Sequence, residues 1–119
     1  MSYIGSFYLI NGNRSAELPD GGCSGEVYTA LWDYCEENFD IDCRMNAPQN
    51  DGIADCVLID EKMAAELLEQ FKNCSLNGMA AAIAQDWELP QAAAERCLTA
   101  FIDNLALVQD GAVLLYEMN

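Results

Sequence analysis

The stretch of residues 78–105, "GMAAAIAQDWELPQAAAERCLTAFIDNL", determines which fold we expect. Met79, Ile83 and Trp87 recur at intervals of four residues, a spacing that predicts a short amphipathic helix. Pro90 interrupts this pattern and suits the first turn of a second helix, where its missing N–H is not needed. The second helix carries an apolar stripe made of Ala94, Cys97, Leu98, Phe101, Ile102, Leu105 and Val108. Two helices joined by a short break therefore form the centre of the predicted fold.

The segments before this pair predict one more helix and two strands. Asp60 is a favourable N-cap for a helix over residues 61–72. Residues 40–45 alternate between polar and apolar side chains, and residues 53–59 form an apolar run, so both are predicted strands. We expect the two strands to pair as a β-hairpin. A hairpin beside three short helices predicts an α+β, winged-helix-like fold with a three-helix bundle.

The two ends of the chain add further elements to this core. Residues 3–10 predict a strand followed by an Asn11-Gly12 turn, and Ser24 can cap a helix that begins near Gly25. Residues 112–117 predict a last strand. We predict that residues 1–40 form a strand–helix extension packed on the core. Residues 41–119 would form the winged-helix-like domain.

The charge of the chain restricts its partners. The 119 residues include 20 Asp and Glu but only 5 Lys and Arg, which gives a net charge of -15. Nucleic acids and anionic membranes bind clusters of Lys and Arg side chains. The five Lys and Arg residues of this chain are scattered, so we predict no direct binding to either. A DNA-reading helix after Pro90 would present Arg96 beside Glu95, a poor combination for contacting bases. A basic protein or a peptide is the partner that this charge favours.

The sequence predicts neither a catalytic centre nor a cofactor or metal site. The chain has no histidine, and none of its six cysteines has the spacing of a zinc or redox motif. Nucleophile and phosphate-binding motifs are also missing. The N-terminus has no secretory signal pattern, and no apolar run approaches the ~20 residues needed to span a bilayer. We therefore expect a non-catalytic cytoplasmic protein whose cysteines are mainly reduced, buried thiols.

One half of the chain resembles a family of peptide-binding domains. The successive segments "VLID", "EKMAAELLEQF", "CSLNG", "MAAAIAQDW", "ELPQ" and "AAERCLTAFIDNLALV" follow each other as in the peptide chaperone of pyrroloquinoline quinone biosynthesis. This chaperone belongs to the RiPP recognition elements, which serve the biosynthesis of ribosomally made, post-translationally modified peptides. The similarity covers residues 53–108. The family's usual Asp-Gly before the second helix is Asn77-Gly78 here.

The resemblance implies that residues 41–119 bind a precursor peptide and present it to a modifying enzyme. In this family the leader segment of the peptide adds as a strand to a sheet edge and lies against the last long helix, a form of β-augmentation. Carried onto this sequence, the edge is the strand over residues 53–59, and the groove wall is the helix after Pro90. The peptide-binding residues implied are Ala54, Cys56, Leu58, Ala94, Cys97, Leu98 and Phe101.

The helix near residues 25–39 offers a second interaction surface, for a partner enzyme. Its wide apolar surface and its acidic end predict docking through Tyr28, Trp32, Glu36 and Glu37. The alternative function is inhibition, because a small acidic bacterial protein suits an immunity protein or a DNA mimic. Such a protein would neutralise a basic toxin or a DNA-processing enzyme by electrostatic capture.

Overall fold

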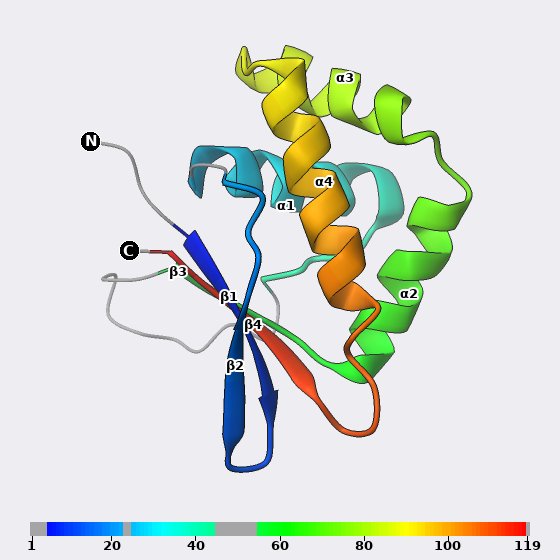
Figure 1. Cartoon of the computed structure of the whole chain (residues 1–119). Coiled ribbons are helices and arrows are strands. Elements are labelled where there is room, and N and C mark those ends of the chain that lie inside the picture. The colour runs from blue at the N-terminus through cyan, green and yellow to red at the C-terminus, as the bar shows by residue number, and fades with distance from the viewer. Residues whose placement is uncertain (1–4, 23–24, 45–54, 119) are drawn as a thin grey trace.

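The described part of the chain forms a four-stranded antiparallel sheet with four helices packed on one of its faces (Figure 1). The computed structural model describes residues 5–22, 25–44 and 55–118. The strands are β1 (Gly5–Asn11), β2 (Arg14–Leu18), β3 (Asp55–Ile59) and β4 (Val113–Met118). The helices are α1 (Gly25–Phe39), α2 (Glu61–Lys72), α3 (Leu76–Trp87) and α4 (Gln91–Leu105). The α+β class predicted from the sequence is confirmed.

The two ends of the chain meet in the middle of the sheet. The strand order is β2-β1-β4-β3, so β1 and β4 are the central strands and pair along their length from Gly5↔Met118 to Ile10↔Val113. The N-terminal strand is therefore an integral part of the sheet. The division predicted at residue 40 passes through one sheet and one hydrophobic core.

The strand pairing differs from the predicted hairpin. β3 pairs with β4, from Asp55↔Met118 to Ile59↔Leu114, and residues 40–44 form no strand. Their alternation is nevertheless present, because Ile41 and Cys43 are buried while Asp42 is exposed. An alternating pattern requires only an extended chain with one covered face, and here that face belongs to the hydrophobic core. Met45, Ile53 and Ala54, which complete the two predicted strands, lie outside the described residues.

Strand β2 was not predicted from the sequence. It consists of "RSAEL", which has no β-branched or aromatic residue, and its side chains are exposed up to Leu18. The strand forms because the predicted turn holds it beside β1, where Tyr8 lies opposite Glu17. Gly12 in this turn has a φ of +62°, a conformation that glycine adopts without strain.

The helices begin close to the residues at which the sequence predicts them to begin. The Asp60 side chain accepts a hydrogen bond of 2.8 Å from the Met63 N–H at the start of α2. The Ser75 side chain accepts a hydrogen bond of 3.0 Å from the Gly78 N–H at the start of α3. This helix therefore begins at Leu76, ahead of Met79, where the predicted apolar spacing starts. Helix α4 begins directly after Pro90. The predicted cap of α1, Ser24, lies outside the described residues. None of the described helices has the length and apolarity that a membrane span requires.

Aromatic rings join the helix layer to the sheet. Phe7 of β1 lies 5.1 Å from Tyr28 and 4.9 Å from Tyr116 between ring centroids, and Trp32 lies 5.1 Å from Phe101. These five side chains, which we call the aromatic cluster, are at most 3% exposed. They come from β1, α1, α4 and β4, so one cluster connects the central strands with two helices. Aromatic pairs of this kind each add about 0.5–1.5 kcal/mol beyond the area they bury.

We predict that Gly5→Ala destabilises the protein through this cluster. A Cβ at Gly5 would overlap the ring and hydroxyl of Tyr116, which is 1% exposed and packed against other rings. Overpacking of this kind costs about 1–3 kcal/mol of unfolding free energy. Gly78→Ala is the matched control, because a Cβ there meets only Ser75, at 3.4 Å or more. We expect it to leave stability unchanged or to raise it by about 0.5–1 kcal/mol. Equal urea midpoints for the two variants would contradict the prediction.

Candidate functional site

The predicted wall of the peptide groove lies inside the hydrophobic core. Ala94, Cys97, Leu98 and Phe101 lie on α4 and are each at most 1% exposed. The helical spacing that suggested a groove wall therefore reports core packing, and a peptide has no access to these side chains in this structure.

The other half of the predicted groove faces the opposite way. Val57 and Ile59 of β3 point into the core, so the alternating residues Cys56 and Leu58 point to the other face of the sheet, on which none of the described helices packs. Both are half-buried, and Leu58 lies beside Leu115 of β4. The sheet thus separates Cys56 and Leu58 from the four α4 residues. The structure does not describe Ala54.

Only the acidic part of the predicted partner surface on α1 is accessible. Tyr28 and Trp32 belong to the aromatic cluster and are 0% and 3% exposed, so neither side chain is accessible to a partner in this structure, unlike the predicted docking surface. The Tyr28 hydroxyl donates a hydrogen bond to the Asp20 carbonyl oxygen, which satisfies its polar group inside the core. Glu36 and Glu37 are exposed, as a docking role requires.

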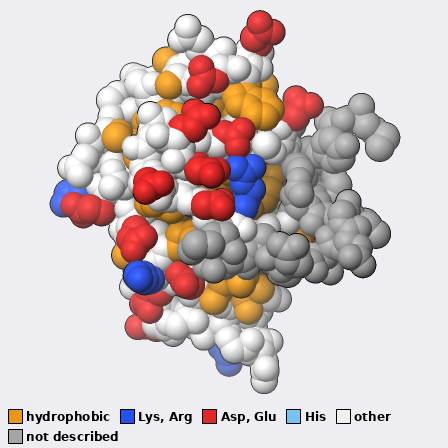
Figure 2. Space-filling model, turned by 180° about the vertical axis from the view of Figure 1, so that it is seen from behind, with side chains coloured by type: hydrophobic (Ala, Val, Ile, Leu, Met, Phe, Trp, Pro, Cys, Tyr) orange, Lys and Arg blue, Asp and Glu red, His pale blue; other side chains and the backbone are white. Residues whose placement is uncertain are grey.

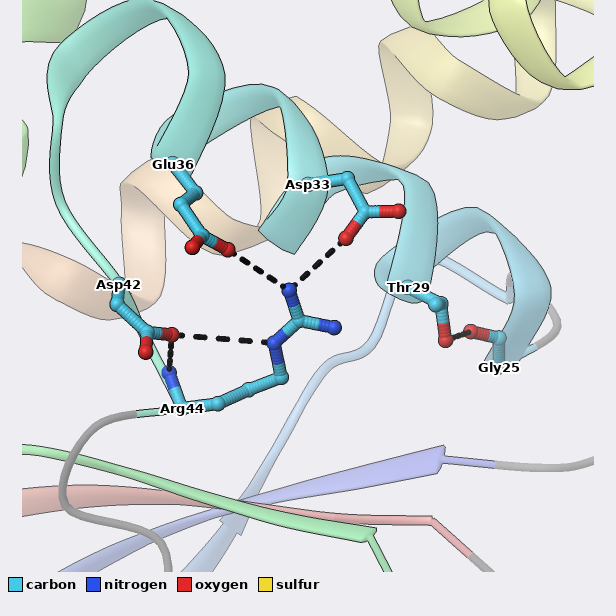
Figure 3. A network of polar contacts seen from close by, with 6 residues as sticks. All are labelled: Gly25, Thr29, Asp33, Glu36, Asp42 and Arg44. Atoms are coloured by element: carbon cyan, nitrogen blue, oxygen red, sulfur yellow. Dashed lines mark hydrogen bonds and ion pairs between the residues drawn. The ribbon is translucent and has the colours of Figure 1, made fainter.

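Carboxylates from α1 and the segment after it surround Arg44 (Figure 3). Its Nη2 lies 2.8 Å from Asp33 Oδ1 and 3.2 Å from Glu36 Oε2, and its Nε lies 3.9 Å from Asp42 Oδ1. The Arg44 backbone N–H also donates to Asp42 Oδ1 at 2.9 Å. Between described residues, every ion pair in the protein involves Arg44. Viewed from behind, Asp and Glu side chains gather around a basic side chain on this face (Figure 2).

The charge of Arg44 is held firmly by its neighbours. Burial alone would lower the pKa of this guanidinium, but the hydrogen bond to Asp33 and the charges of Asp33, Asp42 and Glu36 outweigh burial and raise it. Arg44 is therefore a fixed positive charge that compensates part of the acidic face. Because three carboxylates share one base, the face remains negative.

A hollow of about 290 Å³ opens between α1 and α3 next to this network. Asp33 and Glu37 stand one turn apart on α1, and Asp86 stands near the end of α3. The remaining lining side chains are aromatic or apolar: Ala30, Tyr34, Ile83 and Trp87. We call this site the acidic hollow.

The floor and rim of the acidic hollow differ in polarity. Ala30 and Ile83 are each 2% exposed and form part of the packing between α1 and α3, whereas Trp87 at the end of α3 is 41% exposed. Burial raises the pKa of the Tyr34 hydroxyl, and the nearby Cys74 and Cys35 thiols raise it further. Tyr34 therefore remains a neutral phenol. The hollow combines an apolar base, two aromatic rings and three carboxylates.

This combination of groups suits an organic cation. Carboxylates attract an ammonium or guanidinium group, and an exposed indole binds the same group through its π face. A metal ion is a poorer match, since the described residues contain no cluster of three or more Asp, Glu, His or Cys placed to hold one.

The acidic hollow was not predicted as a site from the sequence. Trp87 continues the spacing of Met79 and Ile83, and this periodicity placed it inward with them. In the structure α3 ends at Trp87, and Glu88 adopts a left-handed φ of +52° immediately after it. The Asp86-Trp87 pair at a helix end was the available signal, but its position beside α1 is a tertiary feature.

Comparison of the chain with protein-family models, with curated proteins and with solved structures finds no match. The similarity of residues 53–108 to RiPP recognition elements therefore stays a prediction.

We expect Arg44→Met to change stability only slightly at moderate salt. The side chains of the network are 36–53% exposed, and exposed ion pairs contribute about 0.2–1 kcal/mol each. The substitution removes the pairs and leaves three carboxylates close together, so low salt should enlarge the loss. Arg14→Met on β2 is the control with the same charge change at an exposed site. Urea unfolding at low salt and at about 1 M salt should show the two variants converging as screening increases. A loss specific to Arg44 that persists at high salt would contradict an electrostatic origin.

Proposed function

We propose that this protein is a non-catalytic binding protein that captures a basic segment of a peptide or protein. The acidic hollow between α1 and α3 carries this proposal, because it joins three carboxylates to an exposed indole. The proposal retains the peptide-binding role expected from the sequence and assigns it to a different surface.

The dimensions and chemistry of the acidic hollow fit one lysine or arginine side chain. The methylene stem of the bound side chain would lie on Ala30 and Ile83, which supply apolar contact. The charged end of that side chain would reach Asp33 or Glu37 of α1, or Asp86 of α3. Trp87 would cover the cation with its ring, a contact that contributes about 0.5–1 kcal/mol at an exposed site.

The net charge supports the same kind of partner over longer distances. A charge of -15 on 119 residues creates a field that attracts a basic partner and orients it before contact. This steering accelerates association more than it increases affinity. A basic precursor peptide and a basic toxin or DNA-processing enzyme are both compatible with it. In the second case the protein would act as an inhibitor.

Strand addition remains a second candidate mode of binding. β3 is the last strand in the order β2-β1-β4-β3 and pairs with β4. A peptide in extended conformation would bind there through backbone hydrogen bonds. Because Cys56 and Leu58 face away from the helices, such a peptide would also contact the open sheet face.

We predict that removing the three carboxylates of the acidic hollow weakens binding of a basic probe by about three- to 150-fold. The probe is a fluorescent peptide with Lys and Arg residues separated by Gly, titrated by anisotropy at moderate salt. The variant Asp33→Asn/Glu37→Gln/Asp86→Asn loses three charge interactions of about 0.2–1 kcal/mol each. Trp87→Ala alone should weaken binding about two- to fivefold through the lost cation–π contact.

The matched control changes the net charge by the same amount elsewhere. Glu17→Gln/Glu66→Gln/Glu69→Gln removes three exposed carboxylates on β2 and α2, none of which lines the hollow. We expect this control to weaken binding only through the general field. Equal weakening by the two triple variants would show that net charge alone attracts the probe, and the proposed site would be wrong.

Hydrogen exchange separates the two binding modes. If the probe occupies the acidic hollow, backbone amides of β3 should exchange at the same rate with and without it. If it adds as a strand, amides of residues 55–59 should become more protected, because new backbone hydrogen bonds cover them. Slower exchange in β3, with no effect of the carboxylate substitutions, would favour strand addition over the hollow.

A further inference from the structure

The chain folds back over α1 directly after the helix ends. Asp40 adopts a left-handed φ of +56°, and the Ile41 N–H donates a hydrogen bond of 3.3 Å to the Cys35 carbonyl oxygen. The next residues run back along the helix, with Ile41 and Cys43 buried and Asp42 exposed. This reversal brings Cys43 to the helix face that carries Cys35.

The two cysteines lie close together inside the core. Both are 0% exposed and belong to the same hydrophobic cluster. Both are free thiols in this structure. The nearby Cys43 thiol, followed by burial, strongly raises the pKa of Cys35, so this thiol stays protonated at neutral pH. Cys97 of α4 is a third buried thiol near them.

The outward side of the same segment is also anchored. Arg44 follows Cys43 directly and forms its ion pairs with Asp33 and Glu36 of α1 (Figure 3). Cys43 is therefore held toward Cys35 by a backbone reversal on one side and by charge contacts on the other. Two thiols kept close together in this way are arranged for covalent linkage.

We propose that Cys35 and Cys43 form a reversible disulfide that fastens residues 41–44 to α1 when the protein meets an oxidising disulfide. The inference stands apart from the binding function proposed above. The oxidant is a small disulfide of the glutathione class. Each cysteine gives up one thiol hydrogen and one electron, an S–S bond forms between them, and the oxidant is reduced to two thiols. The reaction therefore balances without a metal or a further cofactor.

The order of attack follows from the environment of the two thiols. Cys35 lies inside helix α1, whereas Cys43 lies in a segment without regular structure and is the more easily displaced of the two. Both sulfurs are enclosed in the folded protein, so the reaction requires residues 41–44 to separate briefly from α1. The Cys43 thiol then gives its proton to water, and its sulfur attacks the small disulfide, releasing one thiolate that takes up a proton. The Cys35 sulfur then displaces the second thiol from the mixed disulfide as its own proton leaves.

The linkage would have a structural effect on the acidic face. It closes a loop of residues 35–43, which reduces the freedom of the unfolded chain and favours the folded state. It also fixes Arg44 beside Asp33, a carboxylate of the acidic hollow.

The test is direct mapping of the linkage in the full chain. The protein is equilibrated in oxidised or reduced glutathione at pH 8, free thiols are alkylated, and the fragments are analysed by mass spectrometry. Cleavage at Asp and Glu is needed, because no Lys or Arg lies between the two cysteines. We expect fragments containing Cys35 and Cys43 to be joined after oxidation, with the loss of two hydrogens, and separated by a reductant. The exposed Cys74 should instead react with alkylating reagent in the reduced protein.

Variants make the outcome independent of any one substitution. Oxidation should raise the urea midpoint of the wild type and of Cys97→Ala, while Cys43→Ala and Cys35→Ala should show no such redox-dependent rise. Failure of the wild-type fragments to join after long equilibration would overturn the proposal. So would preferential linkage of Cys35 to Cys97.

Discussion

The contact of Phe7 with Tyr28 and Tyr116 is the interaction on which the rest of the fold depends. It places the first described strand, the first helix and the last strand around one point, with ring centroids 4.9–5.1 Å apart. Trp32 and Phe101 extend the same cluster to α4. Because these rings are rigid and fully enclosed, they fix where α1 lies over the sheet. The N-terminal segment cannot then be an accessory to a separate core, since it supplies the middle of this one.

The position of α1 determines which of its groups face solvent. Its inner face is fully used by the aromatic cluster and by Leu31 and Cys35, so its carboxylates have only the outer face available. An isolated carboxylate in the core would be very costly, and the acids therefore collect outside. Asp33 and Glu37 meet Asp86 where α1 and α3 pack through Ala30 and Ile83. The acidic hollow is thus a consequence of packing the apolar sides of two helices together.

The sequence predicted local features of the fold well and its long-range pairings poorly. Helix stripes and the Asp60 cap depend on neighbours a few residues away, and the structure confirms them. The partner of β3 is β4, over 50 residues later, and no local pattern in residues 55–59 identifies it. For the same reason an apolar residue such as Phe101 was assigned to a groove, because periodicity does not distinguish a core face from a binding face. The acidic hollow depends on two helices and was missed.

The charge excess also links stability with binding. The chain has 20 acidic side chains and only 5 basic ones, so the acidic side chains repel one another in the folded protein. Arg44 reduces this repulsion at one place. Arg44 pairs with only one of the three carboxylates of the acidic hollow, Asp33. A basic partner at the hollow would add positive charge close to all three. Any partner that binds the folded state in preference to the unfolded one stabilises it by mass action. The aromatic cluster therefore provides the stability that allows α1 and α3 to expose carboxylates, and a basic partner would relieve the repulsion that remains between them.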